Sequence, residues 1–369
     1  MRARTAPVVI GHRGAPGYRP EHTRGSYELA FQLGADAVEP DIVATRDGVL
    51  VLRHENEISG TTDVADHPEF ADRRTTKEVD GVELTGWFTE DFTWAELSVL
   101  RARERIPKLR QASSTFDGHY PLLRLRDLLE LIDRTAEAAG RDGGGRDGGG
   151  RTTPGSPGLV AELKHATYFA AAGLPLDELF LAELADAGWN DRSGVVVESF
   201  ERTVLGTLHD RGFRGRRVYL VESSGAPADR VAALGSSAPG YDTDVSLRGL
   251  YALGSAAASP AHRVDGISVE TSQVLSSGSV SVALFGEEDA ADVGAVTSDL
   301  VDLAHSAGLA VFCWTLRPEN GMLPPEFRTS STDTEWGDWR RYYSILLHSG
   351  VDGVFADHPD LAVSVRDNR

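Results

Sequence analysis

Residues 8–13, VVIGHR, and residues 37–43, AVEPDIV, are two short apolar runs that carry ionisable side chains. In the second run, Glu39 and Asp41 are two positions apart, so on a strand they would face the same way. Two carboxylates about 4 Å apart repel each other by roughly 4 kcal/mol at an effective dielectric constant near 20. A hard divalent cation between them would remove this repulsion. The two runs therefore predict strands whose ends carry a metal site.

Further apolar runs follow along the chain, and helix-spaced apolar sets separate them. One such set is Leu125, Leu128, Leu129 and Ile132, at the i, i+3, i+4 and i+7 spacing of a helix face. The strand candidates are, in chain order, 8–12, 37–43 with 49–53, 159–163, 194–198, 217–222, 266–270, 310–315 and 353–357. Strands that alternate with helices pair in parallel, and eight of them close into a barrel. The sequence therefore predicts an α/β protein with a (β/α)8 TIM barrel and a site at the carboxyl ends of its strands.

Two segments interrupt this alternation in an otherwise single domain over residues 1–369. A chain of this length fits one domain, because α/β barrels exceed 200 residues as one unit. Residues 56–120 have no clean period and follow the second strand, so we expect a small insertion that caps the active-site face. A surface excursion with a core of its own is the alternative. Residues 141–158 contain Arg-Asp-Gly-Gly-Gly twice, which predicts a flexible Gly-rich loop.

Composition limits the classes of partner. The chain has 37 basic and 56 acidic side chains and a formal net charge of −19, which argues against nucleic acid as a partner. A local basic pocket could still accept one phosphate. Cys313 is the single cysteine, so no disulfide can form within the chain. No apolar run has the length of a membrane span, and we therefore predict no transmembrane segment.

Several short motifs in a fixed order resemble those of the glycerophosphodiester phosphodiesterase family, especially its bacterial secreted and periplasmic branch. They are His12-Arg13-Gly14, Pro20-Glu21-His22-Thr23, Gly34-Ala35-Asp36, Glu39-x-Asp41, Thr45-Arg46-Asp47-Gly48, His54-Glu55, Glu162-x-Lys164, Ser199-Phe200, Trp314-Thr315, Gly350-Val351-Asp352-Gly353 and Asp357-His358-Pro359. The resemblance spans almost the whole chain and is thin between residues 224 and 296. Glu55 departs from it, because the family usually has aspartate after this histidine.

The resemblance implies a metal-dependent phosphodiesterase that uses two histidines. Such an enzyme must neutralise the phosphodiester charge, supply a base for the attacking oxygen and supply an acid for the leaving oxygen. Glu39, Asp41 and Glu162 would hold one divalent ion, Ca²⁺ in preference to Mg²⁺. His12 and His54 would be the acid and base, because imidazole titrates near neutral pH. Which histidine has which role is left open.

The remaining site residues are expected to bind the substrate or to support the groups that do. Glu21 would orient Arg13 or a histidine. The expected substrate-binding residues are Arg13, Lys164, Trp314 and Phe200. Three glutamates end similar apolar runs and could replace Glu162, namely Glu198, Glu222 and Glu270. The histidines read as structural are His22, His165 and His358.

The resemblance implies hydrolysis of glycerophosphocholine or glycerophosphoethanolamine to an alcohol and glycerol 3-phosphate. The first alternative is a lysophospholipase D that releases the head group of a lysophospholipid and leaves lysophosphatidic or cyclic phosphatidic acid. A sphingomyelinase D-like lipase and an inactive phosphoglycerol-binding barrel are more distant alternatives. Either water or a neighbouring glycerol hydroxyl could attack phosphorus. We expect a secreted mature form without its signal, with a cytoplasmic protein as the alternative.

Overall fold

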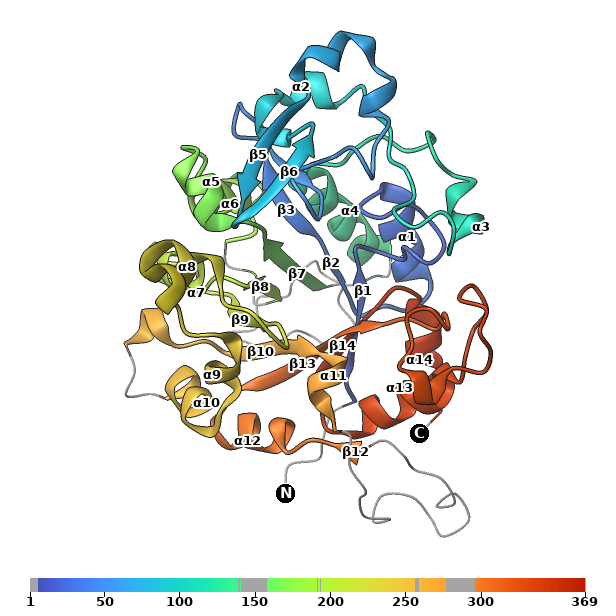
Figure 1. Ribbon diagram of the computed structural model, residues 1–369, viewed down its shortest axis with the longest axis vertical. Coiled ribbons are helices and arrows are strands. Elements are labelled where there is room, and N and C mark those ends of the chain that lie inside the picture. Colours follow the sequence, from blue (N-terminus) through green and yellow to red (C-terminus); the bar gives the residue numbers. More distant parts are fainter. Residues whose placement is uncertain are drawn as a thin grey trace.

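The computed structural model in Figure 1 describes residues 6–138, 140, 158–190, 192, 194–255, 259–276 and 296–368. The predicted Gly-rich loop, residues 141–158, lies outside these ranges except for Gly158, which begins a strand. In the described ranges, no helix has both the length and the apolar character needed to span a membrane.

Parallel strands at eight positions close into a barrel. They are β1 (Val8–His12), β2 (Ala37–Glu39) continued by β3 (Asp41–Ala44), β7 (Gly158–Leu163), β8 (Val195–Ser199), β9 (Arg216–Val221), β10 (Gly266–Glu270), β13 (Ala310–Leu316) and β14 (Gly353–Ala356). The ring closes because β1 pairs with both β14 and β2, and β2 pairs with β7. This confirms the predicted (β/α)8 barrel.

The second barrel position is divided at Pro40, which has no backbone N–H to donate to a neighbouring strand. On one side of the break, Glu39 is in register with His12 of β1. On the other side, Asp41 is in register with Glu162 of β7. The predicted strand at 49–53 is β4 (Leu50–Leu52), which pairs antiparallel with β3. It therefore extends the sheet beyond the barrel.

Helices surround the ring of strands (Figure 1). They are α1 (Arg24–Gln32), α4 (Leu125–Ala138), α5 (Ala166–Ala171), α6 (Leu176–Asp186), α7 (Arg202–Asp210), α8 (Ala228–Leu234), α9 (Tyr241–Val245), α10 (Leu247–Gly254), α11 (Thr271–Val274), α12 (Leu300–Ser306), α13 (Trp339–His348) and α14 (Pro359–Asp367). A short antiparallel pair, β11 (Leu275–Ser276) with β12 (Val296–Thr297), lies near α11. In α4, the predicted apolar face from Leu125 to Ile132 is buried against the barrel's outer core.

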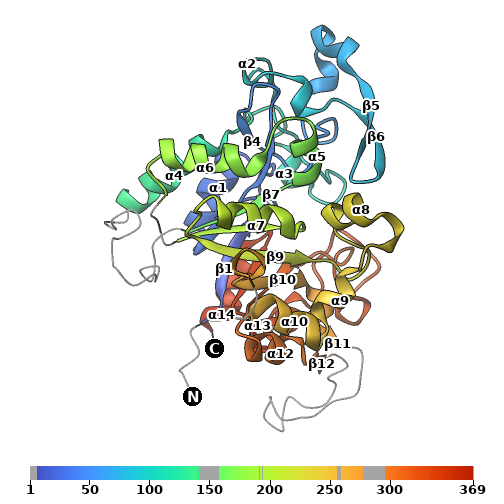
Figure 2. The ribbon, with the colours of Figure 1, turned by 90° about the vertical axis from the view of Figure 1, so that its left-hand side faces the viewer.

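The chain between β4 and α4 forms a lobe beyond one end of the barrel (Figures 1 and 2). It contains the hairpin β5 (Thr75–Val79) and β6 (Val82–Gly86), with the short helices α2 (Trp94–Leu97) and α3 (Gln111–Ser114). Phe88 and Phe92 are fully buried, and Phe92 belongs to the same apolar core as the strands and helices of the barrel. The lobe corresponds to the predicted insertion at 56–120.

The interior of the barrel has its own apolar layer, separate from the core between strands and helices. Its buried members are Ile10, Ala37, Val160, Val218, Phe312 and Phe355. Side chains from opposite sides of the ring meet here, so the barrel is packed rather than hollow. This layer lies below the polar strand ends and gives them a rigid base.

Replacement of Ile10 by alanine should leave a cavity in this layer. We expect Ile10→Ala to lower the free energy of unfolding by about 2–5 kcal/mol. Val8 lies on the same strand and is 38% exposed, so Val8→Ala should cost less than about 1 kcal/mol. Urea unfolding of both variants checks the comparison. Equal losses would contradict a packed interior.

Candidate active site

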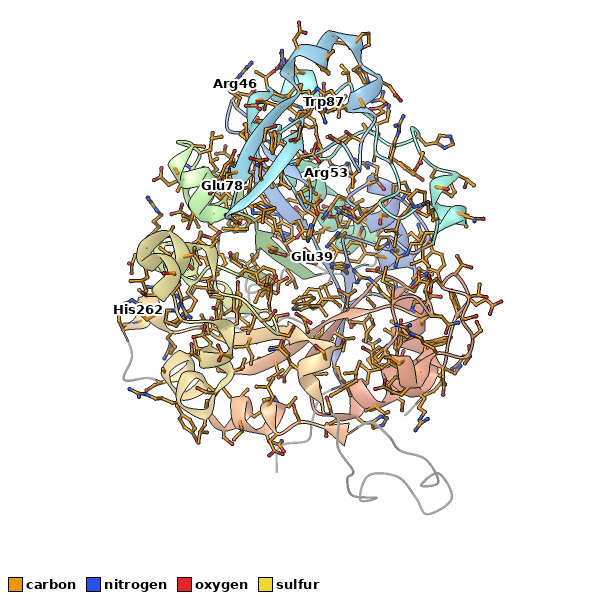
Figure 3. The ribbon with its side chains drawn as sticks, in the orientation of Figure 1. Glu39, Arg46, Arg53, Glu78, Trp87 and His262 are labelled. Carbon is orange, nitrogen blue, oxygen red and sulfur yellow. The ribbon has the colours of Figure 1, made fainter. Side chains whose placement is uncertain are left out.

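Ionisable side chains from four neighbouring barrel strands meet at the carboxyl end of the ring. They are His12 at the end of β1, Glu39 at the end of β2, Glu162 in β7 and Glu198 in β8. The register places Glu162 beside Glu198 across the β7–β8 pair. Figure 3 shows Glu39 near the middle of the ring, with Glu78 and Trp87 in the lobe above it. The groups therefore lie where a TIM barrel places its active site.

A cavity of about 100 Å³ opens between these strand ends. Its lining comprises His12, Arg13, Glu39, His54, Glu162, Glu198, Phe200, Leu220, Trp314, Thr315, Arg317 and Phe355. The remaining predicted residues, Glu21, Asp41 and Lys164, contact residues of this lining. The structure thus brings all ten predicted site residues together around one cavity.

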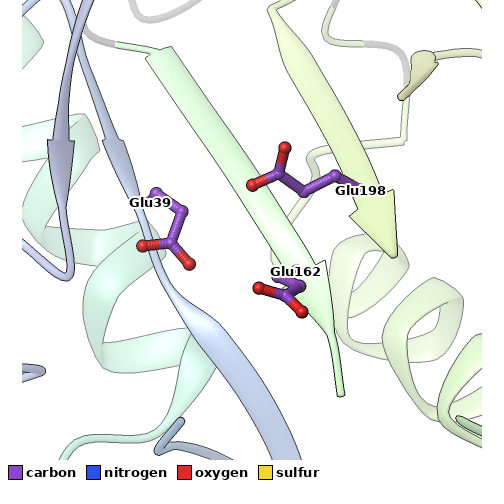
Figure 4. A group of neighbouring side chains, drawn as sticks. All are labelled: Glu39, Glu162 and Glu198. Atoms are coloured by element: carbon purple, nitrogen blue, oxygen red, sulfur yellow. The ribbon is translucent and has the colours of Figure 1, made fainter. Parts of the chain in front are cut away.

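Three buried carboxylates form the centre of the site. Each of Glu39, Glu162 and Glu198 offers an oxygen atom, and these atoms all lie within 4.8 Å of one another (Figure 4). Burial and the neighbouring Asp41 raise the pKa of Glu162 to about 8, against the effect of Lys164. Burial and nearby carboxylates also raise the pKa values of Glu39 and Glu198 well above the usual range. These carboxylates are costly to hold together unless a cation or protons lie between them.

The donor set fits a hard divalent cation, which binds carboxylate oxygens. The second oxygen of Glu198, Oε2, is buried and has no hydrogen-bond partner in the described part of the chain. From the sequence, Glu198 was expected only as an alternative metal ligand in place of Glu162, whereas the structure places both in the cluster. The other two alternatives differ: Glu270 accepts hydrogen bonds from Ser223, and Glu222 is exposed at the end of β9.

Asp41 lies next to this cluster and is held from two sides. Its Oδ2 atom forms an ion pair with Arg13 Nε at 3.1 Å and hydrogen bonds with His22 Nε2 at 3.0 Å. Its Oδ1 atom is buried without a hydrogen-bond partner in the described ranges, with Lys164 Nζ 3.8 Å away. Asp41 therefore remains a predicted metal ligand through Oδ1. His22 also contacts the hydroxyl of Tyr27, which accords with a structural role.

The first histidine is oriented by a carboxylate from the last barrel strand. His12 Nδ1 lies 2.6 Å from Asp357 Oδ1, so Nδ1 donates and Nε2 keeps its lone pair. Burial and Arg13 lower the pKa of His12 to about 4, although Asp357 opposes this shift. The ring is therefore neutral at neutral pH, and Nε2 can accept a proton.

The second histidine has a similar arrangement. His54 Nδ1 lies 2.5 Å from Glu55 Oε1, and Lys164 Nζ donates to His54 Nε2 at 3.3 Å. Burial, Arg13 and Lys164 together lower the pKa of His54 to about 3. Glu55 differs from the aspartate usual in the resembled family, yet it still reaches Nδ1. Its extra methylene group is accommodated because Arg105 also holds the carboxylate.

Two cations and two aromatic rings complete the cavity wall. Arg13 Nη1 donates to Glu21 Oε2 at 3.1 Å, so Glu21 holds the guanidinium in place. Lys164 Nζ lies 2.9 Å from Glu162 Oε1 and 5.5 Å from the centre of the Phe200 ring. Phe200 and Trp314 pack edge to face with centroids 5.8 Å apart. The cavity therefore has a charged side and an apolar side.

Four residues near the histidines carried no predicted role. Asp357 and Arg317 contact each other at the end of the barrel, and Arg105 and Arg110 come from the insertion. Asp357 belongs to the quoted Asp357-His358-Pro359 motif, which was its only signal in the sequence. The two insertion arginines occur in a segment without periodicity, and no sequence pattern indicated a role for them.

A family model described as the glycerophosphoryl diester phosphodiesterase family matches residues 12–140 and 240–361, which is more than half of the chain. The chain therefore belongs to this family of phosphoric diester hydrolases. The matched residues leave out the segment that carries Glu162, Lys164 and Glu198, so the family model does not cover these three.

Individual relatives differ in how much of the chain they match. A glycerophosphodiester phosphodiesterase of Haemophilus influenzae is 25% identical over 371 residues, covering 96% of this chain and 88% of that protein. A glycerophosphodiester phosphodiesterase of Arabidopsis thaliana is 42% identical over 125 residues, covering 34% of this chain. This chain spans 33% of the length of that relative.

Solved structures support the fold. A candidate glycerophosphoryl diester phosphodiesterase of Silicibacter pomeroyi has a TM-score of 0.62 at 22% identity, covering 100% of this chain and 95% of that one. A phosphodiesterase of Oleispira antarctica, in complex with the product sn-glycerol-3-phosphate, has a TM-score of 0.54 at 18% identity. This match covers 98% of this chain and 97% of the Oleispira antarctica chain.

Loss of one cluster carboxylate should weaken binding of Ca²⁺ and Mg²⁺. Loss of a group that only supports a metal ligand typically costs about 10- to 100-fold in affinity, so Glu198→Gln should cost at least about 10-fold. Glu39→Gln and Glu162→Gln should behave alike. Glu270→Gln is the matched control, because Glu270 also ends a barrel strand but binds Ser223. Isothermal titration calorimetry measures the affinity of each variant for Ca²⁺ and Mg²⁺. An unchanged affinity in Glu198→Gln would show that Glu198 is not a ligand of the metal.

Proposed function

We propose that this protein hydrolyses glycerophosphodiesters, such as glycerophosphocholine and glycerophosphoethanolamine, to an alcohol and glycerol 3-phosphate. The observation that carries this proposal is the cluster of three buried carboxylates beside two histidines whose Nδ1 atoms are both held by carboxylates. Family membership supports the reaction class. The glycerol 3-phosphate bound by the Oleispira antarctica protein supports the product.

One divalent cation belongs to the proposed site. Glu39, Glu162 and Glu198 would hold it, and Asp41 Oδ1 is a further oxygen without a hydrogen-bond partner in the described ranges. The cation, when bound, would neutralise charge on the phosphoryl oxygens. We favour Ca²⁺ over Mg²⁺, because Ca²⁺ accepts several protein carboxylates in irregular geometry whereas Mg²⁺ usually keeps most of its water.

The histidines supply proton transfer in this proposal. Because Nδ1 of each ring faces a carboxylate, Nε2 is the atom that exchanges a proton with the substrate, and at His54 it does so once Lys164 Nζ turns from it to the phosphate. One ring takes the proton of the attacking oxygen, and the other gives a proton to the leaving alcohol oxygen. An anionic phosphodiester beside the rings favours the protonated form of one of them. Arg13 and Lys164 add fixed positive charge next to the phosphate.

We also propose that the glycerol hydroxyl next to the phosphate is the attacking group. The base histidine removes the hydroxyl proton, the new O–P bond closes a five-membered cyclic phosphate, and the bond to the alcohol breaks as that oxygen gains a proton. Water then opens the ring with the two histidines in exchanged roles. Two histidines beside one phosphate are suited to this exchange, because each ends the first step in the state that it needs for the second.

A pair of substrate analogues tests the attacking group. Replacement of the neighbouring hydroxyl of glycerophosphocholine by hydrogen should abolish choline release, because no cyclic phosphate can form. Replacement of the distal hydroxyl by hydrogen should leave release within a few-fold of the parent compound. Comparable cleavage of both analogues would show that water attacks directly.

A second candidate function is head-group release from lysophospholipids. The observation that favours it is a hollow of about 590 Å³ on the insertion side of the site. Its wall includes the apolar side chains of Ile106, Leu109 and Met322, which suit an alkyl chain. Arg105 also lines it and contacts Glu55, the partner of His54, so this arginine links the hollow to one of the two histidines.

Substrate preference separates the two candidates. Choline or ethanolamine release should be measured from the short glycerophosphodiesters and from their 1-acyl and 1-alkenyl forms, with Ca²⁺, with Mg²⁺ and with EDTA. We expect release from the short diesters with a metal and none with EDTA. Strong preference for the lipid forms would support the lysophospholipase D function instead. Release from no substrate under any metal would overturn the proposed reaction.

Variants of the two histidines provide the control for that assay. His12→Gln and His54→Gln should each lower kcat by about 10²- to 10⁴-fold, the usual contribution of an acid or base. His209→Gln should keep full activity, because His209 is half-buried near the end of α7, away from the cavity lining, and pairs with Asp210. Activity retained in His12→Gln or His54→Gln would contradict the assigned role.

A further inference from the structure

The two histidines share a feature beyond the site itself. Each ring is held at Nδ1 by a carboxylate, and each carboxylate is bound in turn by an arginine of the insertion. The two arginines, Arg105 and Arg110, are five residues apart in one short loop. One segment outside the barrel therefore contacts the supports of both histidines.

The contacts around His12 are closely packed. Asp357 faces His12 through Oδ1 and accepts from Arg110 Nη2 at 2.6 Å and Arg317 Nε at 2.7 Å through Oδ2. Arg110 Nε donates to Glu319 Oε1 at 2.9 Å. The side chains of Arg110 and Asp357 are only 5% and 2% exposed. Arg110 thus gives Asp357 one hydrogen bond and Glu319 another, and at such burial these charge-assisted bonds fix a carboxylate that could otherwise rotate about its side-chain bonds.

The contacts around His54 repeat this pattern. Glu55 accepts from Arg105 through both oxygens, at 2.9 Å from Nη1 and 2.7 Å from Nη2. Arg105 also donates to both oxygens of Glu21, at 2.8 and 2.6 Å. Glu21 is the carboxylate that holds Arg13. Arg105 thus links the support of His54 to the support of the substrate-binding guanidinium.

The loop that carries both arginines is held by hydrogen bonds within the insertion. The backbone N–H of the buried Glu104 donates to Asp117 Oδ1 at 2.7 Å, and Ile106 N–H donates to Glu104 Oε1 at 3.0 Å. Arg110 N–H donates to the Ile106 carbonyl at 3.0 Å. The separation of the two guanidinium groups is therefore set by the fold of the insertion.

We propose that Arg105 and Arg110 are positioning residues that set the orientation of His54 and His12, so that the insertion completes the active site as well as capping it. The proposal rests on the proposed function in that the two histidines are its acid and base. It extends that function, because neither arginine lines the 100 Å³ cavity. Each acts through a carboxylate on Nδ1, and an imidazole held in this way keeps its tautomer and direction.

Nitrogen resonances of the histidine rings test the pairing without any turnover. The protein is labelled with ¹⁵N-histidine, and His12→Gln and His54→Gln assign the two rings. Arg110→Ala should shift the His12 ring nitrogens and leave those of His54 unchanged, whereas Arg105→Ala should do the reverse. Arg103→Ala is the matched control, because Arg103 lies in the same segment but pairs with the exposed Asp66. Unchanged rings in both variants, or both rings shifted alike in each, would overturn the proposal.

Kinetics test the same pairing through the chemistry. With glycerophosphocholine, kcat should be about 10- to 100-fold lower in each alanine variant, while KM stays within about 3-fold of the wild type. This is the usual effect of losing a residue that supports a functional group without contacting the substrate. The p-nitrophenyl ester of glycerol phosphate has a leaving group that needs no acid. In the first turnover of this ester, the variant of the acid histidine should release p-nitrophenol at nearly the wild-type rate, and so should the variant of the arginine paired with that histidine. Equal losses of both arginine variants on both esters would indicate general loss of structure.

Lysine variants distinguish the effect of the arginine geometry from the effects of its positive charge and of a general loss of stability. Arg110→Lys and Arg105→Lys keep the positive charge but lose the planar fork. They should retain the wild-type melting temperature within a few degrees and still show the lower kcat and the paired ring shift. Full activity in both would overturn the proposal. Absence of diester hydrolysis by the wild type would instead refute the proposed function, and the ring shifts would still decide the pairing.

Discussion

Repulsion among buried carboxylates is the constraint on which the arrangement of this site depends. Glu39, Glu162 and Glu198 bring oxygens within 4.8 Å of one another away from water, and Asp41 lies beside them. At an effective dielectric constant near 20, each unit-charge contact of about 4 Å costs roughly 4 kcal/mol. Arg13 and Lys164 offset part of this cost, since each pairs with one or more of these acids. The remainder explains why the group suits a divalent cation.

The barrel makes this concentration of charge possible because its strands end at one place and its interior is rigid. Glu39 and Asp41 show the effect of backbone detail. Glu39 is level with His12 of β1 and Asp41 is level with Glu162 of β7, and the register against β7 is the same on both sides of Pro40. The two acids, two positions apart, therefore both reach Arg13, Glu39 through the backbone N–H and Asp41 through Nε.

Much of the fold and part of the site were predictable because local patterns carry them. Apolar runs in the sequence predicted all eight barrel strands. His12, Glu39 and Glu162 lie in or at the end of three of those runs. Glu198 could not be separated from Glu222 and Glu270, since all three end similar runs and only the order of strands in the ring shows which one adjoins Glu162. The roles of Arg105 and Arg110 depend on contacts between the insertion and distant strands, which no local period records.

Charge balance links metal and substrate in this site. The acids near the cavity are Glu21, Glu39, Asp41, Glu55, Glu162, Glu198, Glu319 and Asp357, and the cations among them are Arg13, Arg105, Arg110, Lys164 and Arg317. With the acids ionised, the site is negative, as is the whole chain at −19, and it would repel a phosphodiester anion. With the central acids protonated, as their raised pKa values favour, the repulsion falls but their oxygens no longer suit a cation. A divalent cation bound by these oxygens would displace those protons and add positive charge at the same point, so we expect binding of the metal to precede tight binding of the substrate.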